Sequence, residues 1–254
     1  MVQSLDRALN LLEALAGADE DVSLSQLTEQ LGLPLGTAHR LLSSLASRGY
    51  AAQDRTTRRY GPGPKLLEVA TRAAASRRFS LERIARPALQ RLTEATGETS
   101  NLLVLHGYEV AYSEQVPSPH MVRLFTEVGH RVPLYCTGGG KAILAGMGLE
   151  QRDAYLAGMV IRAWTPKTLG SVDALRADLE LSSQRGFAID DEERELGVCC
   201  VAAPIFDRIG RCVAALSISG PSTRMSVARA IDLGRAVRAE ADGCSAALGF
   251  ASAV

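Results

Sequence analysis

Small polar side chains that could bind a ligand gather near the end of the chain. Two runs of alternating residues, at about 198–206 and 211–219, predict a pair of strands joined by a turn. Alternation along a strand places Cys200, Ser217 and Ser219 on one face and apolar residues on the other. Two hydroxyls and a thiol could bind a small molecule, although the same side chains could equally fill tight packing against a helix.

The turn between these strands sets which residues face each other. If Asp207 and Gly210 close this turn, Cys200 lies directly opposite Ser217 across the two strands. We expect this pair to lie on the polar face of the hairpin.

A run of glycines is the second feature that could bind a ligand. Residues 136–140 lead into the helical pattern of 141–145, and glycines before a helix expose backbone N–H groups that can hold a carboxylate. The run is not a Walker loop, because Tyr135 and Ala142 occupy two of its defining positions. An anion site and a purely structural turn both fit this pattern.

Carboxylates form a third group, which could bind a divalent metal or transfer protons. The four histidines, at positions 39, 106, 120 and 130, lie elsewhere and show no metal-ligand spacing. A solvated acidic turn is therefore the commoner outcome, and we expect no metal and no cofactor. The carboxylates of this cluster are Asp190, Asp191, Glu192, Glu193 and Glu195.

The composition is that of an ordinary globular protein, with 254 residues of which 46% are hydrophobic and 22% charged. No apolar run approaches the roughly 18 residues of a spanning helix, and the first residues lack a secretory signal pattern. Five cysteines without a CxxC pair argue against a disulfide framework. We expect a cytoplasmic protein with no membrane partner.

Positive charge is concentrated in one part of the chain, although its 28 basic and 28 acidic residues balance. Residues 31–78 contain nine Lys or Arg residues against two acidic ones, a charge of +7. A basic segment joined to a mildly acidic remainder is typical of a polyanion-binding module coupled to another function.

Three short helical patterns precede or enter this basic stretch. Leucines at helical spacing predict a helix over 3–16. Ser23 and Gln26 have the form of a capping box for a second helix, and Pro34 is suited to the start of a third. Two short helices joined by a turn, the second basic outside, are typical of a helix-turn-helix. The outward side chains of the third helix, which we expect to contact DNA, are Thr37, His39, Arg40, Ser43 and Ser44.

A basic hairpin is predicted after the third helix. Extended runs at 50–53 and 58–60 flank a polar turn and complete a winged-helix domain over residues 1–62. The wing arginines, Arg58 and Arg59, would contact phosphates, which gives affinity without sequence information.

The helical pattern resumes over residues 63–79 and predicts a linker helix. Its small and apolar face could be a dimer contact, because palindromic DNA sites require two-fold symmetry, or it could pack on its own domain. Residues 80–254 then mix helices, such as 81–96, with short strands, including one at 122–125. Adjacent hairpins with helices around them predict a mixed α+β domain with an antiparallel sheet.

The run GFAIDDEERELGVCCVAAPIFD at 186–207 resembles the signature of the IclR family of bacterial transcription regulators. Segments 3–8, 33–42, 137–142 and 216–221 also resemble family motifs, so the resemblance covers almost the whole chain. It implies a winged helix-turn-helix domain joined to a GAF-like effector-binding domain, in a homodimer or a dimer of dimers.

The resemblance also implies where an effector binds. In related regulators that sense small organic acids, contacts come from the glycine turn, the acidic motif and the last hairpin. One departure is Gly139, where alanine is frequent in the family, so that the pocket is slightly enlarged. Carried over by motif, the effector-binding residues are Gly138, Gly139, Asp190, Cys200, Ser217 and Ser219.

These patterns predict a non-enzymatic, ligand-responsive regulator that binds operator DNA and a small organic or aromatic acid. They favour a repressor of a catabolic operon over an activator. The alternative is an enzyme acting on small carboxylic acids through Cys200 or the acidic cluster, but no base and nucleophile show a recognisable spacing. A sensor that acts only through protein partners is disfavoured by the basic helix-turn-helix.

Overall fold

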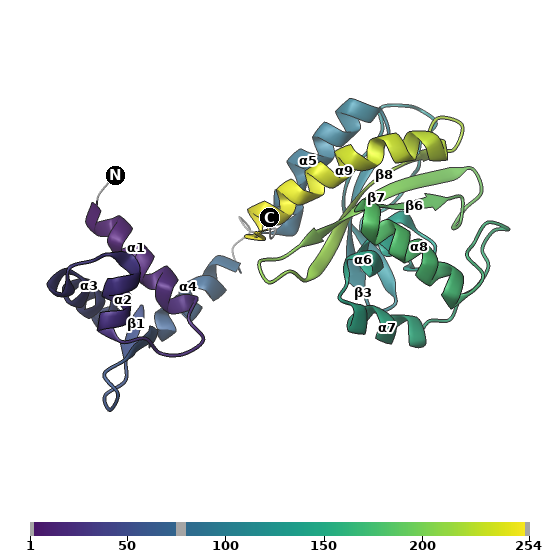
Figure 1. Cartoon of the computed structure of the whole chain (residues 1–254). Coiled ribbons are helices and arrows are strands. Elements are labelled where there is room, and N and C mark those ends of the chain that lie inside the picture. Colours follow the sequence, from purple (N-terminus) through teal and green to yellow (C-terminus); the bar gives the residue numbers. More distant parts are fainter. Residues whose placement is uncertain (1–2, 75–79, 252–254) are drawn as a thin grey trace. The chain divides into compact units, whose positions relative to one another are not determined.

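The computed structural model describes residues 3–74 and 80–251. The chain divides into two units, Met1–Phe79 and Ser80–Val254 (Figure 1). The predicted linker helix is α4, and the last part of that prediction, 75–79, lies outside the described residues. The elements of the first unit are α1 (Gln3–Ala16), α2 (Leu24–Leu31), α3 (Leu35–Ser47), β1 (Ala51–Gln53), β2 (Tyr60–Pro62) and α4 (Pro64–Ala74).

The first unit is a helix-turn-helix built from locally encoded helix ends. The predicted capping box is confirmed: the Ser23 hydroxyl accepts from the N–H of Gln26, whose side chain accepts from the Ser23 N–H at 3.0 Å. Gly32 ends α2 in the left-handed conformation (φ 61°), and Pro34 is the N-cap of α3. The core is made of fully or almost fully buried side chains from the three helices and the hairpin: Leu11, Leu15, Leu27, Leu42, Ala51 and Tyr60.

The hairpin after α3 is present, but its second strand begins at Tyr60 rather than at residue 58. The carboxylate of Asp54 accepts hydrogen bonds from the backbone N–H groups of Thr56 and Thr57, at 2.9 and 2.6 Å. Arg58 then adopts a left-handed backbone conformation (φ 60°), which strands cannot accommodate. The turn is therefore longer than predicted, and it holds more of the basic side chains.

The second unit contains a six-stranded sheet in the order β5-β4-β3-β8-β7-β6, in which every neighbouring pair is antiparallel. The predicted fold class is confirmed, a helix-turn-helix domain followed by a mixed domain with an antiparallel sheet. The elements are α5 (Leu81–Thr96), β3 (Thr99–His106), β4 (Glu109–Val116), β5 (Arg131–Pro133), α6 (Gly138–Gly146), α7 (Leu149–Ala157), α8 (Val172–Arg185), β6 (Ala188–Asp191), β7 (Val198–Phe206), β8 (Cys212–Pro221) and α9 (Val227–Ala247).

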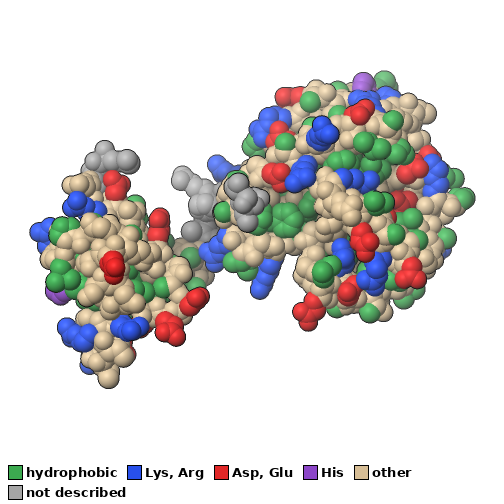
Figure 2. Space-filling model, viewed as in Figure 1, with side chains coloured by type: hydrophobic (Ala, Val, Ile, Leu, Met, Phe, Trp, Pro, Cys, Tyr) green, Lys and Arg blue, Asp and Glu red, His purple; other side chains and the backbone are tan. Residues whose placement is uncertain are grey.

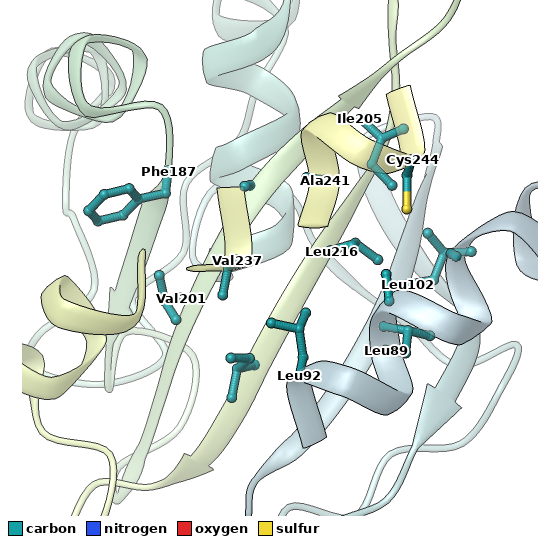
Figure 3. Packing of buried hydrophobic residues seen from close by; sticks show 14 of the residues in the cluster. Leu89, Leu92, Leu102, Phe187, Val201, Ile205, Leu216, Val237, Ala241 and Cys244 are labelled. Carbon is teal, nitrogen blue, oxygen red and sulfur yellow. The ribbon is translucent and has the colours of Figure 1, made fainter. Parts of the chain in front are cut away.

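The sheet separates two hydrophobic clusters. On one face, α5 and α9 pack side by side, and Leu89, Leu102, Leu216 and Val237 lie within that cluster (Figure 3). On the other face, α6 packs on β7 and β8, with α7 and α8 outside it. The apolar face predicted for the terminal hairpin is the one under α5 and α9, and the small polar face lies under α6.

The predicted register of the terminal hairpin is wrong by two residues. Cys200 lies opposite Ser219 rather than Ser217. The turn is closed one residue later than predicted, because the N–H of Asp207 donates to the carbonyl of Arg211 at 2.9 Å, and a bulge next to Cys212 adds a second residue. An even shift leaves every side chain on its predicted face.

Two further predictions for the second unit need correction. Residues 122–125 are not a strand: Val122 and Phe125 are 70% and 74% exposed, so this segment has no buried face to pack on a sheet. The short strand β5 occupies that edge instead. The glycines do not precede α6 but form its first turn.

Among the residues that the structure describes, no helix is both long and apolar enough to cross a membrane.

Two adjacent glycines in α6 should respond differently to alanine. A Cβ at Gly140 would collide with the backbone carbonyl of Leu134, whereas a Cβ at Gly139 would meet the flexible end of Leu103, 2.8 Å from Cδ1. We expect Gly140→Ala to lower the free energy of unfolding by about 3 kcal/mol or more, and Gly139→Ala to lower it by less than about 1 kcal/mol. Urea unfolding monitored by tryptophan fluorescence checks this difference; equal effects would contradict the close approach of α6 to Leu134.

Candidate functional site

The outer face of α3 carries the residues that were predicted to contact DNA. His39, Arg40, Ser43 and Ser44 are exposed and Thr37 is half-buried. The opposite face is anchored in the core by two fully buried residues, Ala38 and Leu42. The helix therefore presents hydrogen-bonding side chains on a rigid support, as major-groove recognition requires.

The hairpin next to α3 carries arginines, and Lys and Arg side chains gather around it on the surface (Figure 2). Arg58 is exposed in the turn. Arg59 is exposed too, but its guanidinium donates to the backbone carbonyl of Asp21 at 3.1 Å, so it also ties the hairpin to the loop before α2. Arg55, at the tip of the turn, is a further exposed cation that was not among the predicted contacts.

A cavity in the second unit brings together most of the residues predicted to bind an effector. It lies between the first turn of α6, the polar face of the sheet and the loop after β6. Gly138, Gly139, Asp190, Cys200 and Ser217 all line it. Its remaining walls are partly aromatic and apolar and include Leu103, Tyr112, Leu124, Phe125 and Val132, with Thr126, His130, Thr137, Arg194, Glu195 and Val198.

The sixth predicted residue, Ser219, stands behind this lining rather than in it. Its hydroxyl lies 2.7 Å from the thiol of Cys200, and both Ser217 and Ser219 accept from the side-chain amide of Asn101 at 3.4 Å. Ser219 can thus act on a ligand only by orienting Cys200. The effector-binding role of all six residues stays a prediction.

Asn101 is a residue that the sequence reasoning missed. It is fully buried on β3, next to β8, and its carbonyl oxygen accepts from Gln115 and Thr126 at 3.1 Å each. This amide therefore connects the two serines with the loop 124–126 that covers one side of the cavity. A lone Asn in a strand carries no motif, and only the pairing of β3 with β8 reveals its role.

The first turn of α6 offers backbone N–H groups to the cavity. Thr137 is the N-cap residue, and its hydroxyl accepts from the N–H of Gly140 at 3.3 Å. Gly138 and Gly139 have no side chains, so their backbone lies directly at the cavity wall. The positive end of the helix dipole at this position favours an anionic group.

Asp190 is buried beside this turn, at 3% exposure. Burial, together with the carboxylate of Glu193, raises the pKa of Asp190 to about 7, although its Oδ1 accepts from the N–H of Glu193 at 2.8 Å. Near neutral pH this group is partly protonated, and a protonated carboxyl can donate a hydrogen bond to a carboxylate. An aspartate can in this way contribute to binding an anion.

The acidic cluster is only in part the solvated turn that was expected: Glu195 is exposed, but Asp190 and Glu193 are buried. Glu193 is 5% exposed and forms an ion pair with Lys141, which is itself 1% exposed. Lys167 pairs at the surface with Asp191 at 3.1 Å and with Glu192 at 2.8 Å. The pattern was misread because the lysines that pair with these carboxylates are distant in sequence. In the described part of the chain, no group of three His, Cys, Asp or Glu side chains could hold a metal ion.

The thiol of Cys200 lacks the features of a nucleophile. Burial and the nearby Asp190 carboxyl raise its pKa above the usual thiol range, whereas reactive cysteines have a lowered pKa. No histidine lies among its hydrogen-bond partners in the described residues; its partner is Ser219. The arrangement can bind and orient a ligand, but it does not support covalent catalysis.

Comparison with known proteins relates both units to one family. The model described as "Bacterial transcriptional regulator IclR C-terminal" matches residues 73–246, and the model "IclR helix-turn-helix domain" matches residues 4–55.

Individual relatives extend over nearly the full chain. The HTH-type transcriptional regulator BhcR of Paracoccus denitrificans is 39% identical over 228 residues, 90% of this chain and 81% of the relative. The acetate operon repressor of Salmonella typhimurium is 37% identical over 238 residues, 93% of this chain and 86% of the relative. The crystal structure of the Agrobacterium tumefaciens repressor BlcR superposes with a TM-score of 0.76 at 26% identity, covering 98% of each chain.

The raised pKa of Asp190 predicts a pH-dependent stability. The pKa of this carboxyl is about 7 in the folded state and about 4 in the unfolded chain, so between these values the folded state holds a proton that the unfolded state releases. The stabilisation is complete below pH 4 and is lost as the pH rises to about 7. Relative to Asp190→Asn, the wild type should therefore lose up to about 4 kcal/mol between pH 4 and 8.

The single tryptophan, Trp164, lies in the second unit and reports its unfolding. Urea titrations at several pH values between about 4 and 8 measure the difference in free energy of unfolding between wild type and variant. The matched control is Asp191→Asn, which makes the same substitution at the neighbouring, half-exposed position outside the cavity. If the free energy of unfolding of the wild type relative to Asp190→Asn did not change with pH, the Asp190 carboxyl would be ionised over the whole range.

Proposed function

The chain belongs to the IclR family of bacterial transcriptional regulators. From this we propose that it is a repressor whose affinity for operator DNA changes when a small organic or aromatic acid binds. DNA binding belongs to the first unit and effector binding to the second. The observation that carries the proposal is the cavity in which Asp190, Cys200 and Ser217 meet the predicted glycines in the first turn of α6. Two of the relatives, the acetate operon repressor of Salmonella typhimurium and the repressor BlcR of Agrobacterium tumefaciens, support a role as a repressor, and the first supports the control of an operon.

In this proposal α3 enters the major groove. Arg40 reaches base edges from the exposed face, and Thr37 and Ser44 lie on the same side of the helix for contacts with bases or phosphates. Arg58, in the wing, binds phosphates. Arg59 does so less freely, because its guanidinium is engaged with the carbonyl of Asp21.

The effector's carboxylate binds where the N–H groups of Gly138 and Gly139 line the cavity. The hydroxyl of Ser217 and a protonated Asp190 donate further hydrogen bonds to its oxygens. Cys200, held by Ser219 at 2.7 Å, packs against the same group. The aromatic and apolar walls enclose the rest of the molecule.

The chain acts on DNA as a dimer or a dimer of dimers, since half-sites related by two-fold symmetry require two copies of α3. Large apolar side chains are exposed on α1 and α4, where Leu5 is 57% and Leu67 is 73% exposed. A second copy that covers them would remove this apolar surface from water. A regulator of bacterial operons works in the cytoplasm.

The alternative of an enzyme is rejected. Members of this family are transcriptional regulators rather than enzymes. The two features proposed for catalysis have other roles: the Cys200 thiol is unactivated, and Glu193 of the acidic cluster is paired with Lys141.

Arg40 separates base recognition from general affinity. We expect Arg40→Ala to weaken operator binding by about 1–3 kcal/mol and to leave binding to random DNA less affected, because it loses a contact with a base. The matched control is Arg58→Ala, which should weaken both DNAs alike and reduce the slope of the salt dependence by about one counterion. Gel-shift titrations at several salt concentrations measure both; an unchanged operator affinity for Arg40→Ala would remove this residue from the recognition face.

Ser217 tests the effector site. Thermal unfolding of the full chain with a panel of small carboxylates and aromatic acids identifies a ligand, because binding to the native state raises Tm. Ser217→Ala should then weaken that ligand about two- to tenfold, which corresponds to one hydrogen bond, and operator binding without ligand should persist. Ser219→Ala should have a smaller effect, and Ser183→Ala, on the exposed face of α8, none. Equal affinity of the wild type and Ser217→Ala would place the ligand elsewhere.

A further inference from the structure

Arg194 supplies a positive charge to the wall of the cavity that neither the motifs nor the proposed function assigns. It lies in the loop between β6 and β7 and lines the cavity together with Gly138, Asp190 and Ser217. Its Cζ is 3.8 Å from the centre of the Trp164 ring, a distance typical of a cation stacked on an aromatic face.

The tryptophan under this guanidinium is held rigidly. Its indole N–H donates to the hydroxyl of Tyr135 at 2.8 Å, and that hydroxyl donates to the carbonyl of Arg162 at 2.8 Å. The loop that contains Trp164 and Thr168 is bound to the backbone next to Arg194, because the hydroxyl of Thr168 donates to the carbonyl of Glu193 at 2.6 Å. The guanidinium is therefore positioned before any ligand arrives.

Arg194 has no counter-ion among the described residues. No carboxylate lies within 4.0 Å of it, its side chain makes no hydrogen bond, and its Nε is buried without a partner. The neighbouring acids are engaged elsewhere: Glu193 with Lys141 and Glu192 with Lys167. Asp190 is partly protonated near neutral pH because its pKa is raised to about 7, and Glu195, although it also lines the cavity, does not pair with Arg194.

A guanidinium that is stacked, partly buried and unpaired is suited to a carboxylate from outside the chain, which it can bind through two parallel hydrogen bonds. We propose that Arg194 is the specificity-determining residue of the effector site: it pairs with a carboxylate of the effector and makes the site select acids over their uncharged amides. This inference rests on the proposed effector site. Trp164 is a positioning residue, because it holds the guanidinium and does not line the cavity.

The chain contains a matched control for this arginine. Arg162 is stacked over the same Trp164 ring, with its Cζ 4.9 Å from the ring centre, but it does not line the cavity. Replacing Arg162 removes a similar cation–π contact without removing the charge from the cavity wall. The pair of variants Arg194→Gln and Arg162→Gln therefore separates ligand binding from support of the tryptophan.

The experiment measures binding of pyruvate, succinate and benzoate, and of pyruvamide, succinamide and benzamide, to the full chain by thermal shift and calorimetry. We expect at least one acid to bind the wild type at least tenfold more tightly than its amide. Arg194→Gln should weaken that acid at least tenfold and abolish the preference over the amide. Arg194→Lys should retain part of the preference, because it keeps the charge but loses the planar fork, and Arg162→Gln should bind like the wild type.

Each other outcome decides between the two levels of the proposal. If none of the acids stabilises the wild type, the acid-binding site itself is contradicted, and the role of Arg194 with it. If an acid binds the wild type and Arg194→Gln equally well, only the role of Arg194 is contradicted. Operator binding in the absence of ligand and far-UV circular dichroism report whether Arg194→Gln is folded. If this variant does not fold, the affinity of Arg194→Lys for the acid is compared with that of Arg162→Gln. Equal affinities of these two variants would contradict the role of Arg194.

Discussion

A buried ammonium group holds the cavity side of the second unit together. Lys141 is 1% exposed, and its Nζ forms ion pairs with Glu193 and, at 2.9 Å, with Asp178. Burial alone would lower the pKa of Lys141, but the two carboxylates raise it instead, so the group stays charged. These side chains come from α6, the loop after β6 and α8. Because a buried charge that loses its partner typically costs about 3–5 kcal/mol, these three segments stay together, and the glycine turn stays beside Asp190.

Two networks of different chemistry meet at the cavity. The charged network around Lys141 fixes the first turn of α6 and the loop of Arg194. The uncharged network around Asn101 connects Ser217 with Thr126 in the loop on the other side. A ligand that contacts both the loop of Arg194 and the loop of Thr126 would connect two segments on opposite sides of the cavity. It would then favour one arrangement of these loops over others.

Local signals in the sequence predicted the helices and most strands, whereas the strand register and the contacts of several cavity residues depend on long-range contacts. The start of α2 depends on hydrogen bonds between near neighbours, and Ser23 caps this helix as the pattern indicates. The faces of the terminal hairpin followed from alternation, whereas its register depended on a bulge that no residue type announces. Asn101 and Arg194 escaped prediction because their positions depend on strand pairing and on a tryptophan thirty residues away in the chain. The acidic cluster was misjudged for the same reason, since Lys141 lies on another element.

The division of the second unit into two hydrophobic clusters has an evolutionary consequence. One cluster, under α5 and α9, has no part in the cavity, while the other lies beneath α6 on the same side of the sheet as the cavity. Substitutions that reshape the cavity can accumulate on one face while the packing on the opposite face preserves the stability of the unit. Since most substitutions are destabilising and only a threshold of stability is selected, such a sheet allows new ligand preferences to arise by drift without loss of the fold.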